Sequence, residues 1–262
     1  MNNVNKTLYI PLYGKAYVSK KGIILADKKA ETLWEKEQFP IRGKSKSKWL
    51  AYYMGMRSAV FDAWVKEQMA LSPEAVVLHI GCGMDSRAER VGHNIHLWFD
   101  VDFPEVIRER RRYYAETDAY RMIPSDARDP HWLENVPKGQ DAIILMEGIS
   151  MYLKKEELIS LLARLTGHFG HVFLLCDTYT TLAARISKYK NPINDVGVST
   201  VYGVDDAKEL ERDTGLSFVQ ECSMTPPHLI QQLQGMERAI FRRVFAGRFA
   251  RKMYRLYAYQ KA

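Results

Sequence analysis

A short apolar run that stops at two glycines constrains the fold of this chain more than any other feature. Residues 75–80 read AVVLHI, and Gly81, Cys82 and Gly83 follow at once. A run of this length, rich in Val, Ile and Leu, is typical of a strand buried on both faces of a parallel sheet. Glycines at its end allow a tight turn and a close approach of backbone to ligand. The sequence therefore predicts a buried strand that leads into a binding loop.

Similar runs recur along the chain and alternate with helical segments. The runs are IHLWFDVDFP (95–104), YRMIPSDARD (120–129), DAIILMEG (141–148) and HVFLLCDT (171–178). Between them, PEVIRERRRYYAET places Pro104 where a helix begins, and KKEELISLLARLTGHFG ends at Gly170, a plausible helix stop. This alternation predicts an α/β fold with a doubly wound, mostly parallel sheet whose ligand lies at the carboxyl ends of the strands.

The two ends of the chain complete the predicted organisation. Residues 49–69 have helical periodicity, so we expect residues 1–70 to form a helical N-terminal cap on a core of residues 71–262. Two more strands are expected after Gly215 and after Lys252, and the alternation in the last one suits a partly exposed edge. Aromatic residues of the cap form either its packing or the wall of an acceptor pocket; they are Tyr9, Tyr13, Tyr17, Trp34, Tyr52 and Tyr53.

Composition and charge bear on whether the chain is a membrane, secreted or nucleic-acid-binding protein. No apolar stretch of the 262 residues is long enough to span a membrane and the N-terminus lacks a signal-peptide core, so we expect a cytoplasmic protein with no membrane partner and three reduced cysteines. The net charge of +7 is concentrated in residues 237–262, where eight Lys and Arg meet one acid. Such a cluster could hold nucleic acid or an anionic surface. A helix docked on the core with a solvated basic face is the favoured interpretation, because apolar residues recur there at helical spacing: Ile240, Phe241, Val244, Phe245 and Phe249.

The glycine turn is followed by an acid at a spacing typical of adenosine ligands. Asp102 lies 19 residues after Gly83, where a carboxylate can bind ribose hydroxyls. The third glycine of a dinucleotide fingerprint would fall at Ser86, which argues against a dehydrogenase. S-adenosylmethionine carries a sulfonium cation and no phosphates, so acids at the strand ends favour it. Four acids are expected there: Asp85, Asp102, Asp126 and Glu147.

Three motifs carry a resemblance to a known family. HIGCGMDSR, WFDVDFPEVI and MEGISMYL, in this order and spacing, resemble the S-adenosylmethionine-dependent methyltransferases that group leucine carboxyl methyltransferase with TcmP-like polyketide O-methyltransferases. The resemblance extends from LYIPLYGKA to about Asp177. It implies a class I, Rossmann-like methyltransferase with a seven-stranded sheet. Ser86 replaces the usual threonine, and His79 stands where many methyltransferases carry an acid.

The resemblance also implies roles for individual residues toward S-adenosylmethionine. Arg57 would pair with the carboxylate of the donor and Glu147 would face its ammonium group. Gly81 and Gly83 would lie against the methionine part, and Asp102 would bind the ribose. Asp126 and Ala127 would flank the adenine. On the acceptor side we expect Tyr152 and, from the cap, Tyr13.

The predicted reaction is direct displacement of the methyl group by an oxygen of a small-molecule acceptor, polyketide-like or another natural product. A carboxylate acceptor would need no base, whereas a hydroxyl would need one, with Tyr13, Tyr152, Tyr179 or Asp177 as positional candidates. No metal is expected, because the histidine pairs at 93 and 96 and at 168 and 171 lack further ligands. Two alternatives stay open: an RNA methyltransferase that uses the basic tail and RERRR at 108–112, although a nucleic-acid partner is not favoured, and a non-catalytic S-adenosylmethionine-binding scaffold.

Overall fold

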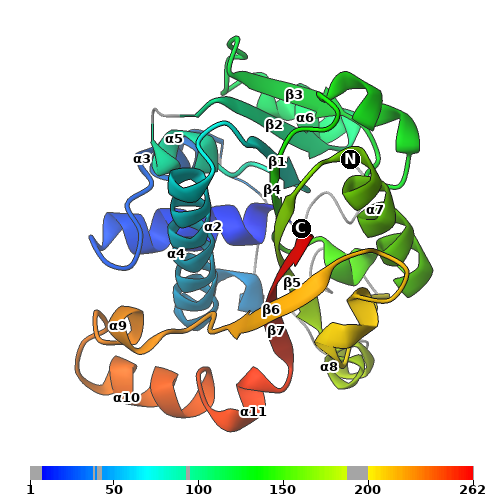
Figure 1. Cartoon of the computed structure of the whole chain (residues 1–262). Coiled ribbons are helices and arrows are strands. Elements are labelled where there is room, and N and C mark those ends of the chain that lie inside the picture. Colours follow the sequence, from blue (N-terminus) through cyan, green and yellow to red (C-terminus); the bar gives the residue numbers. More distant parts are fainter. Residues whose placement is uncertain (1–7, 38, 40–42, 93–94, 188–199, 262) are drawn as a thin grey trace.

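A mixed seven-stranded sheet forms the centre of the protein (Figure 1). The structure, a computed structural model, describes residues 8–37, 39, 43–92, 95–187 and 200–261. The strand order is β3-β2-β1-β4-β5-β7-β6. The strands are β1 (Val76–Ile80), β2 (Leu97–Asp102), β3 (Tyr120–Pro124), β4 (Ala142–Met146), β5 (Val172–Tyr179), β6 (Ser217–Cys222) and β7 (Tyr254–Lys261).

Strands β1 to β5 are parallel, as the sequence predicts. Strand β1 pairs with β2 and β4, β2 with β3, and β4 with β5, while β7 is antiparallel to both β5 and β6. The carboxyl ends of β1–β5 therefore share one edge of the sheet. Because β7 runs the opposite way, its first residue, Tyr254, lies at this same edge, opposite Tyr179.

The prediction that the last strand forms an exposed edge is wrong. Strand β7 lies between β5 and β6, and its central residues 256–259 are buried. Strand β6 is the edge, with four of its six residues exposed. Tyrosine has a large apolar body and a polar tip, so the alternation in YRLYAYQ does not mark one face as solvated. Tyr257 and Tyr259 pack on one face of the sheet while Leu256 and Ala258 pack on the other.

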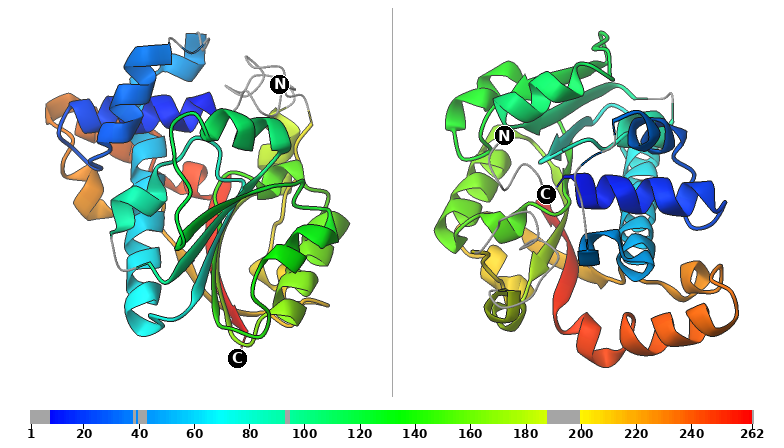
Figure 2. Two further views of the ribbon diagram at one scale, coloured as in Figure 1. Left: turned by 90° about the horizontal axis from the view of Figure 1, so that it is seen from above. Right: turned by 180° about the vertical axis from the view of Figure 1, so that it is seen from behind.

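Helices cover both faces of the sheet (Figures 1 and 2). The longer ones are α2 (Tyr9–Lys20), α3 (Lys28–Glu37), α4 (Lys48–Leu71), α7 (Lys155–His168) and α10 (Gly235–Val244). The shorter ones are α5 (Arg87–Val91), α6 (Pro104–Arg110), α8 (Thr181–Ser187), α9 (Pro227–Ile230) and α11 (Arg248–Arg251). The 3-10 segments are η1 (Gly43–Lys46), η2 (Pro130–Asn135), η3 (Ser150–Tyr152) and η5 (Ala207–Leu210). The predicted helix starting at Pro104 is confirmed, and α7 ends two residues before Gly170.

Helix α4 connects the N-terminal helices to the sheet. Ser47 caps its first turn by accepting a hydrogen bond from the backbone N–H of Trp49. Helix α2 lies so close to α4 that a Cβ on Gly14 would come within 2.6 Å of Met54 Cβ, which explains the glycine there. The predicted helical N-terminal segment is thus present. The division at residue 70 into cap and core stays a prediction.

The C-terminal basic region contains helices, but only part of its apolar set is buried. Phe241 is fully buried and Phe245 half-buried, whereas Ile240, Val244 and Phe249 are exposed. The predicted helix docked on the core with a solvated basic face is confirmed in α10, where Phe241 is buried and the arginines are exposed, but only part of the apolar set takes part in the docking. Among the described residues, no helix has both the length and the apolarity needed to cross a bilayer.

Candidate functional site

One cavity of about 410 Å³ opens at the carboxyl ends of the parallel strands. This volume is within the range of sites for small ligands. Most of the predicted site residues line it: Arg57, Gly81, Gly83, Asp102, Asp126, Ala127, Glu147 and Tyr152. The cavity lies where the topology of an open α/β sheet places a ligand. Sequence reasoning and structure thus select the same edge of the fold.

The glycine turn after β1 has a backbone that other residues would strain. Gly81 has φ 73° and Gly83 has φ 51°, both in the left-handed region. A Cβ on Gly81 would come within 2.9 Å of Ile149 Cδ1 and 3.0 Å of Ile149 Cβ. The turn therefore needs glycine for its conformation, and at Gly81 also for space, and it presents bare backbone to the cavity.

Asp102, at the end of β2, is held by this turn. Its Oδ2 accepts a hydrogen bond from the Gly83 N–H at 2.7 Å, and its Oδ1 accepts one from the Phe103 N–H at 2.8 Å. Burial outweighs these two hydrogen bonds and raises the pKa of the carboxyl from 3.8 to about 6. The two hydrogen bonds thus fix the carboxylate in position, but they do not fully offset the cost of burying its charge.

Asp126 and Ala127 follow β3 at the far end of the cavity. Both Asp126 oxygens bind the Arg128 guanidinium, the shorter contact being 2.5 Å from Nη2 to Oδ2. The hydrogen bond from Arg128 lowers the pKa of Asp126. Ala127 offers a small apolar surface beside this ion pair, which suits the face and edge of a planar heterocycle.

Arg57 and Glu147, predicted to bind opposite charges of one ligand, lie next to each other. Arg57 Nε donates to Glu147 Oε1 at 2.9 Å, and both side chains are buried. Burial would raise the pKa of Glu147, but the guanidiniums of Arg87 and Arg57 outweigh it and lower the pKa to about 2. Glu147 is therefore ionised at any physiological pH.

This pair belongs to a larger buried network of ion pairs. Arg87 contacts Glu147, Asp62 and Asp85. The connected network has four cations (Lys15, Arg57, Arg87, Arg90) and five carboxylates (Asp27, Asp62, Asp85, Glu147, Asp177). Of the motif residues, Asp85 lines the cavity, whereas Arg87 lies behind its wall. With every group ionised, the network has one excess negative charge.

Aromatic and apolar side chains line the cavity beyond Glu147, at the ends of β5 and β7. Tyr152, Tyr179 and Tyr254 lie there, and α4 adds Leu50 and Met54. The rings of Tyr179 and Tyr254 meet edge to face, with their centroids 4.8 Å apart. This end of the cavity can hold an apolar or aromatic molecule.

Tyr254 links the aromatic end to the charged network. Its hydroxyl donates to Asp177 Oδ2 at 2.5 Å and accepts from Arg57 Nη1 at 2.7 Å. Asp177 also accepts from the Gly148 N–H at 2.7 Å, and burial raises the pKa of its carboxyl despite Arg57 and Tyr254. Sequence reasoning missed Tyr254, because only the antiparallel pairing of β7 brings it here and no local pattern signals that pairing.

The structure places Lys15 of the cap at the cavity, and not the predicted Tyr13. Tyr13 does not line the cavity, and its hydroxyl donates to the Lys46 carbonyl oxygen at 3.1 Å. Lys15, which was not singled out, does line it and pairs with Asp85 at 3.1 Å. A lysine on the same helical face as Leu12 and Ala16 was the available sign that this side chain is buried.

Other candidate reactive groups lie away from the cavity or are inert. His168 Nε2 contacts the Val136 carbonyl and His171 Nδ1 contacts Asp141, while His93 lies outside the described residues. Within the described part of the chain, no group of three His, Cys, Asp or Glu side chains is suited to a metal. Burial raises the pKa of the Cys82 thiol well above its ordinary value, so it is not a reactive thiolate.

Comparison with known proteins agrees with this geometry. Residues 6–166 match the family model for leucine carboxyl methyltransferase. The chain is 30% identical over 264 residues to the tetracenomycin polyketide synthesis O-methyltransferase TcmP of Streptomyces glaucescens, with 97% of each chain covered. It is also 30% identical over 184 residues to the S-adenosyl-L-methionine-dependent methyltransferase dpfgK of Gibberella zeae, covering 64% of this chain and 61% of that one.

A solved structure supports the fold. Magnesium protoporphyrin IX methyltransferase from Synechocystis PCC 6803, with bound S-adenosylhomocysteine, superposes with a TM-score of 0.52 at 14% identity, over 98% of this chain and all of that one. Fold and site together define an S-adenosylmethionine-dependent methyltransferase of the class I type. Within that class, the chain belongs to the leucine carboxyl methyltransferase family.

Proposed function

We propose that this enzyme transfers a methyl group from S-adenosylmethionine to a carboxylate oxygen of a small aromatic or apolar natural product. One observation carries the proposal: a single cavity extends from the ribose-binding position at Asp102 to the tyrosines at the ends of β5 and β7. The donor and the acceptor can therefore bind side by side. Three free cysteines favour the cytoplasm as its compartment.

The order of the strands supports a specific orientation of the donor. Asp126 and Ala127 at β3 would hold the adenine, Asp102 at β2 the ribose, and the turn at Gly81 after β1 the methionine part. The next strands along the edge are β4, β5 and β7, which carry the acceptor end. When bound, S-adenosylmethionine supplies a methyl group activated by its sulfonium sulfur.

The charged network fits the ends of the methionine moiety. Among the described residues Arg57 Nη2 forms no hydrogen bond, so it can donate to the donor carboxylate while Nε keeps Glu147 in place. Glu147 would accept from the ammonium group. With every group ionised, the one excess negative charge of the network complements the net positive charge of S-adenosylmethionine. This attraction weakens in the product, which has lost the sulfonium charge.

A carboxylate acceptor is favoured because no carboxylate that lines the cavity is free to act as a base, and His79, which also lines it, is buried with its Nε2 3.2 Å from Arg87 Nη1. Four carboxylates line it in the described part of the chain, and each is engaged. Asp85 and Glu147 are ion-paired with arginines, Asp126 with Arg128, and Asp102 accepts two backbone N–H groups. An ionised carboxylate acceptor needs no deprotonation, so the protein's task is to align the two reactants and exclude water.

A hydroxyl acceptor is the second candidate, and one contact favours it. Tyr254 lines the cavity and donates to the buried Asp177 carboxylate. A proton from an acceptor hydroxyl could pass to Tyr254 Oη while the tyrosine proton passes to Asp177. This route would make methylation sensitive to Tyr254→Phe, whereas carboxylate methylation would not require the phenol proton.

The test uses tritium-labelled S-adenosylmethionine with naphthoic acid and naphthol as matched acceptors. Mild base hydrolyses a methyl ester and releases volatile labelled methanol, but leaves an aryl methyl ether intact. We expect base-labile product from naphthoic acid and little product from naphthol. Base-stable product from naphthol alone would establish the second candidate, and product from neither acceptor would contradict the proposed aromatic acceptor class.

A further inference from the structure

Helix α10 is fixed to α4 by a complete inner face. Phe241 is fully buried and packs edge to face on Tyr52, at 6.2 Å between centroids, while Phe245 stacks on Trp49 at 5.6 Å. Glu237 completes this face, since it accepts from Lys48 at 2.7 Å and from the Tyr52 hydroxyl at 2.6 Å. Met236, Ile240 and Val244 are not part of the buried cluster around Phe241.

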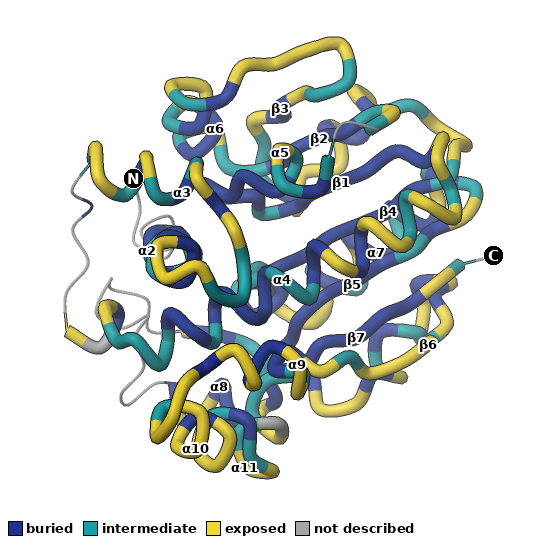
Figure 3. The backbone as a smooth tube through the Cα atoms, turned by 90° about the vertical axis from the view of Figure 1, so that its left-hand side faces the viewer, coloured by how far each residue is buried: buried dark blue, intermediate teal, exposed yellow. Residues whose placement is uncertain are grey.

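A second apolar stripe on α10 lies to the side of the face that packs on α4. Met236, Ile240 and Val244 recur every four residues and are 82%, 43% and 56% exposed. Phe249 on α11 is 68% exposed. Figures 1 and 2 show α10 and α11 one after the other along one edge of the molecule, and Figure 3 shows that most of α10 is exposed.

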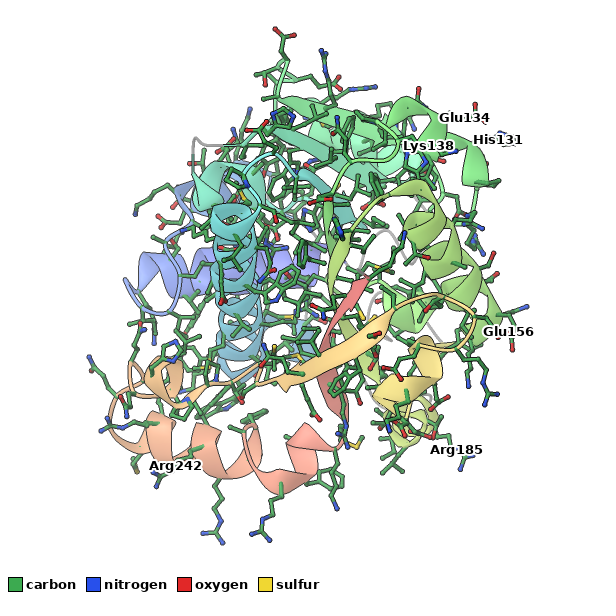
Figure 4. All side chains as sticks on the ribbon, in the orientation of Figure 1. His131, Glu134, Lys138, Glu156, Arg185 and Arg242 are labelled. Carbon is green, nitrogen blue, oxygen red and sulfur yellow. The ribbon has the colours of Figure 1, made fainter. Side chains whose placement is uncertain are left out.

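Unpaired cations occupy the same two helices: Arg243 lies beside the stripe, whereas Arg238 and Arg242 lie across α10 from it. Arg238, Arg242, Arg243, Arg248 and Lys252 are all exposed, and in the described part of the chain none of their side chains forms an ion pair. Figure 4 places Arg242 at the periphery of the molecule. The single acid of residues 237–262, Glu237, is already engaged on the inner face. The exposed surface of α10 and α11 therefore carries both apolar and cationic side chains, on α10 mainly along opposite flanks.

We propose that the exposed α10–α11 surface binds a bilayer that contains anionic lipids. Its apolar residues are Met236, Ile240, Val244 and Phe249, and its cations are the five exposed Arg and Lys of the same segment. Amphipathic helices with Lys and Arg beside an apolar stripe lie in the bilayer interface without spanning it. Cations near an anionic leaflet are attracted to it, and exposed apolar side chains gain by entering its boundary. Nucleic acid would satisfy the cations but would leave the apolar stripe in water.

The α10–α11 surface lies close to the acceptor end of the cavity. Helix α4 separates it from the cavity: Trp49 and Tyr52 face α10, whereas Leu50 and Met54 line the acceptor end. A bilayer bound to α10 and α11 would thus lie one helix away from the position proposed for an apolar acceptor. Such acceptors partition into membranes, so docking would raise their concentration at the enzyme.

The test is cosedimentation of the full chain with vesicles of phosphatidylcholine alone or mixed with phosphatidylglycerol. One variant removes charge (Arg238→Gln/Arg242→Gln/Arg243→Gln), and one removes the stripe (Met236→Ser/Ile240→Ser/Val244→Ser). Matched controls change equally exposed residues elsewhere: Lys66→Gln/Lys208→Gln/Arg212→Gln, and Leu71→Ser/Leu182→Ser/Val219→Ser. An unchanged melting temperature establishes that each variant is folded.

We expect salt-sensitive binding only to the mixed vesicles. Each cation at an anionic surface contributes about fivefold in affinity, so the charge variant should lose roughly a hundredfold. The stripe variant should lose about tenfold or more, and the controls should bind as the wild type does. Absence of binding to the mixed vesicles would overturn the proposal. So would a stripe variant that binds normally, or tight binding to polyuridylate that the stripe variant retains, which would indicate a polyanion site instead.

Discussion

Replacing Asp102 with asparagine tests, without any ligand present, how the titration of this carboxylate changes the stability of the fold. The buried carboxylate accepts the Gly83 and Phe103 N–H groups at 2.7 and 2.8 Å, and its pKa lies at about 6 instead of 3.8. The folded protein thus holds the proton more tightly than the unfolded chain does. Asparagine keeps the shape of the side chain and removes its titration.

The sign and size of the effect follow from proton linkage. For a carboxyl whose pKa is raised on folding, the associated stability is complete below the unfolded pKa and is lost as the pH rises through the folded pKa. A displacement from 3.8 to about 6 corresponds to roughly 3 kcal/mol at about 1.4 kcal/mol per pH unit. Roughly 2 kcal/mol of this falls between about pH 4.5 and 7.5.

Urea denaturation of the wild type and of Asp102→Asn across that pH range measures the effect. The free energy of unfolding of the wild type should fall relative to the variant by about 2 kcal/mol as the pH rises. The asparagine side chain can accept only one of the two backbone hydrogen bonds at every pH, so only the slope is diagnostic. The exposed control Asp118→Asn accounts for the loss of one charge. A flat difference between wild type and Asp102→Asn would refute the raised pKa.

Three further changes test other parts of the structure. Glu147→Gln removes one carboxylate partner from each of the buried guanidiniums of Arg57 and Arg87. It should therefore lower the free energy of unfolding, measured by urea titration, by about 3 kcal/mol. A loss under about 1 kcal/mol would mean that these ion pairs are solvated. Gly81→Ala must adopt a positive φ and contact Ile149, so we expect a loss of about 1–2 kcal/mol by thermal unfolding, and an unchanged melting temperature would argue against the turn described. Phe241→Ala should cost about 3–4 kcal/mol and Ile240→Ala less than about 0.5 kcal/mol in the same assay; equal losses would show that α10 docks differently.

The parts of the site that sequence could predict are those with a local signal. The turn at Gly81 needs a strand before it and residues without Cβ within it, and both features lie within nine residues. Asp102 follows from its spacing to Gly83, because one βαβ unit brings the ends of adjacent parallel strands together. Local pattern and topology agree there, so the predicted position of Asp102 beside the turn is confirmed, while its role toward ribose stays a prediction.

The other features of the site depend on contacts between residues far apart in the chain, for which a single sequence gives no local pattern. Tyr254 reaches the cavity only because β7 enters between β5 and β6, and the tyrosines of that strand concealed its burial. Tyr13 and Lys15 lie on one helix, and a rotation of that helix by half a turn decides which of them faces the cavity. Similarly, α10 carries two apolar stripes, and either could pack on α4. Only the structure shows that the stripe with Phe241 faces inward.

The most direct test of the site is calorimetric titration of S-adenosylmethionine into the wild type, Asp102→Asn and the control Asp118→Asn. A carboxylate that binds ribose hydroxyls contributes about 1.5–3 kcal/mol, so Asp102→Asn should weaken binding roughly 10- to 150-fold while Asp118→Asn binds as the wild type does. NAD should give no heat, because Ser86 replaces the glycine that a dinucleotide turn requires. Equal affinity of all three proteins for S-adenosylmethionine, or binding of NAD as tight as that of the methyl donor, would contradict the account.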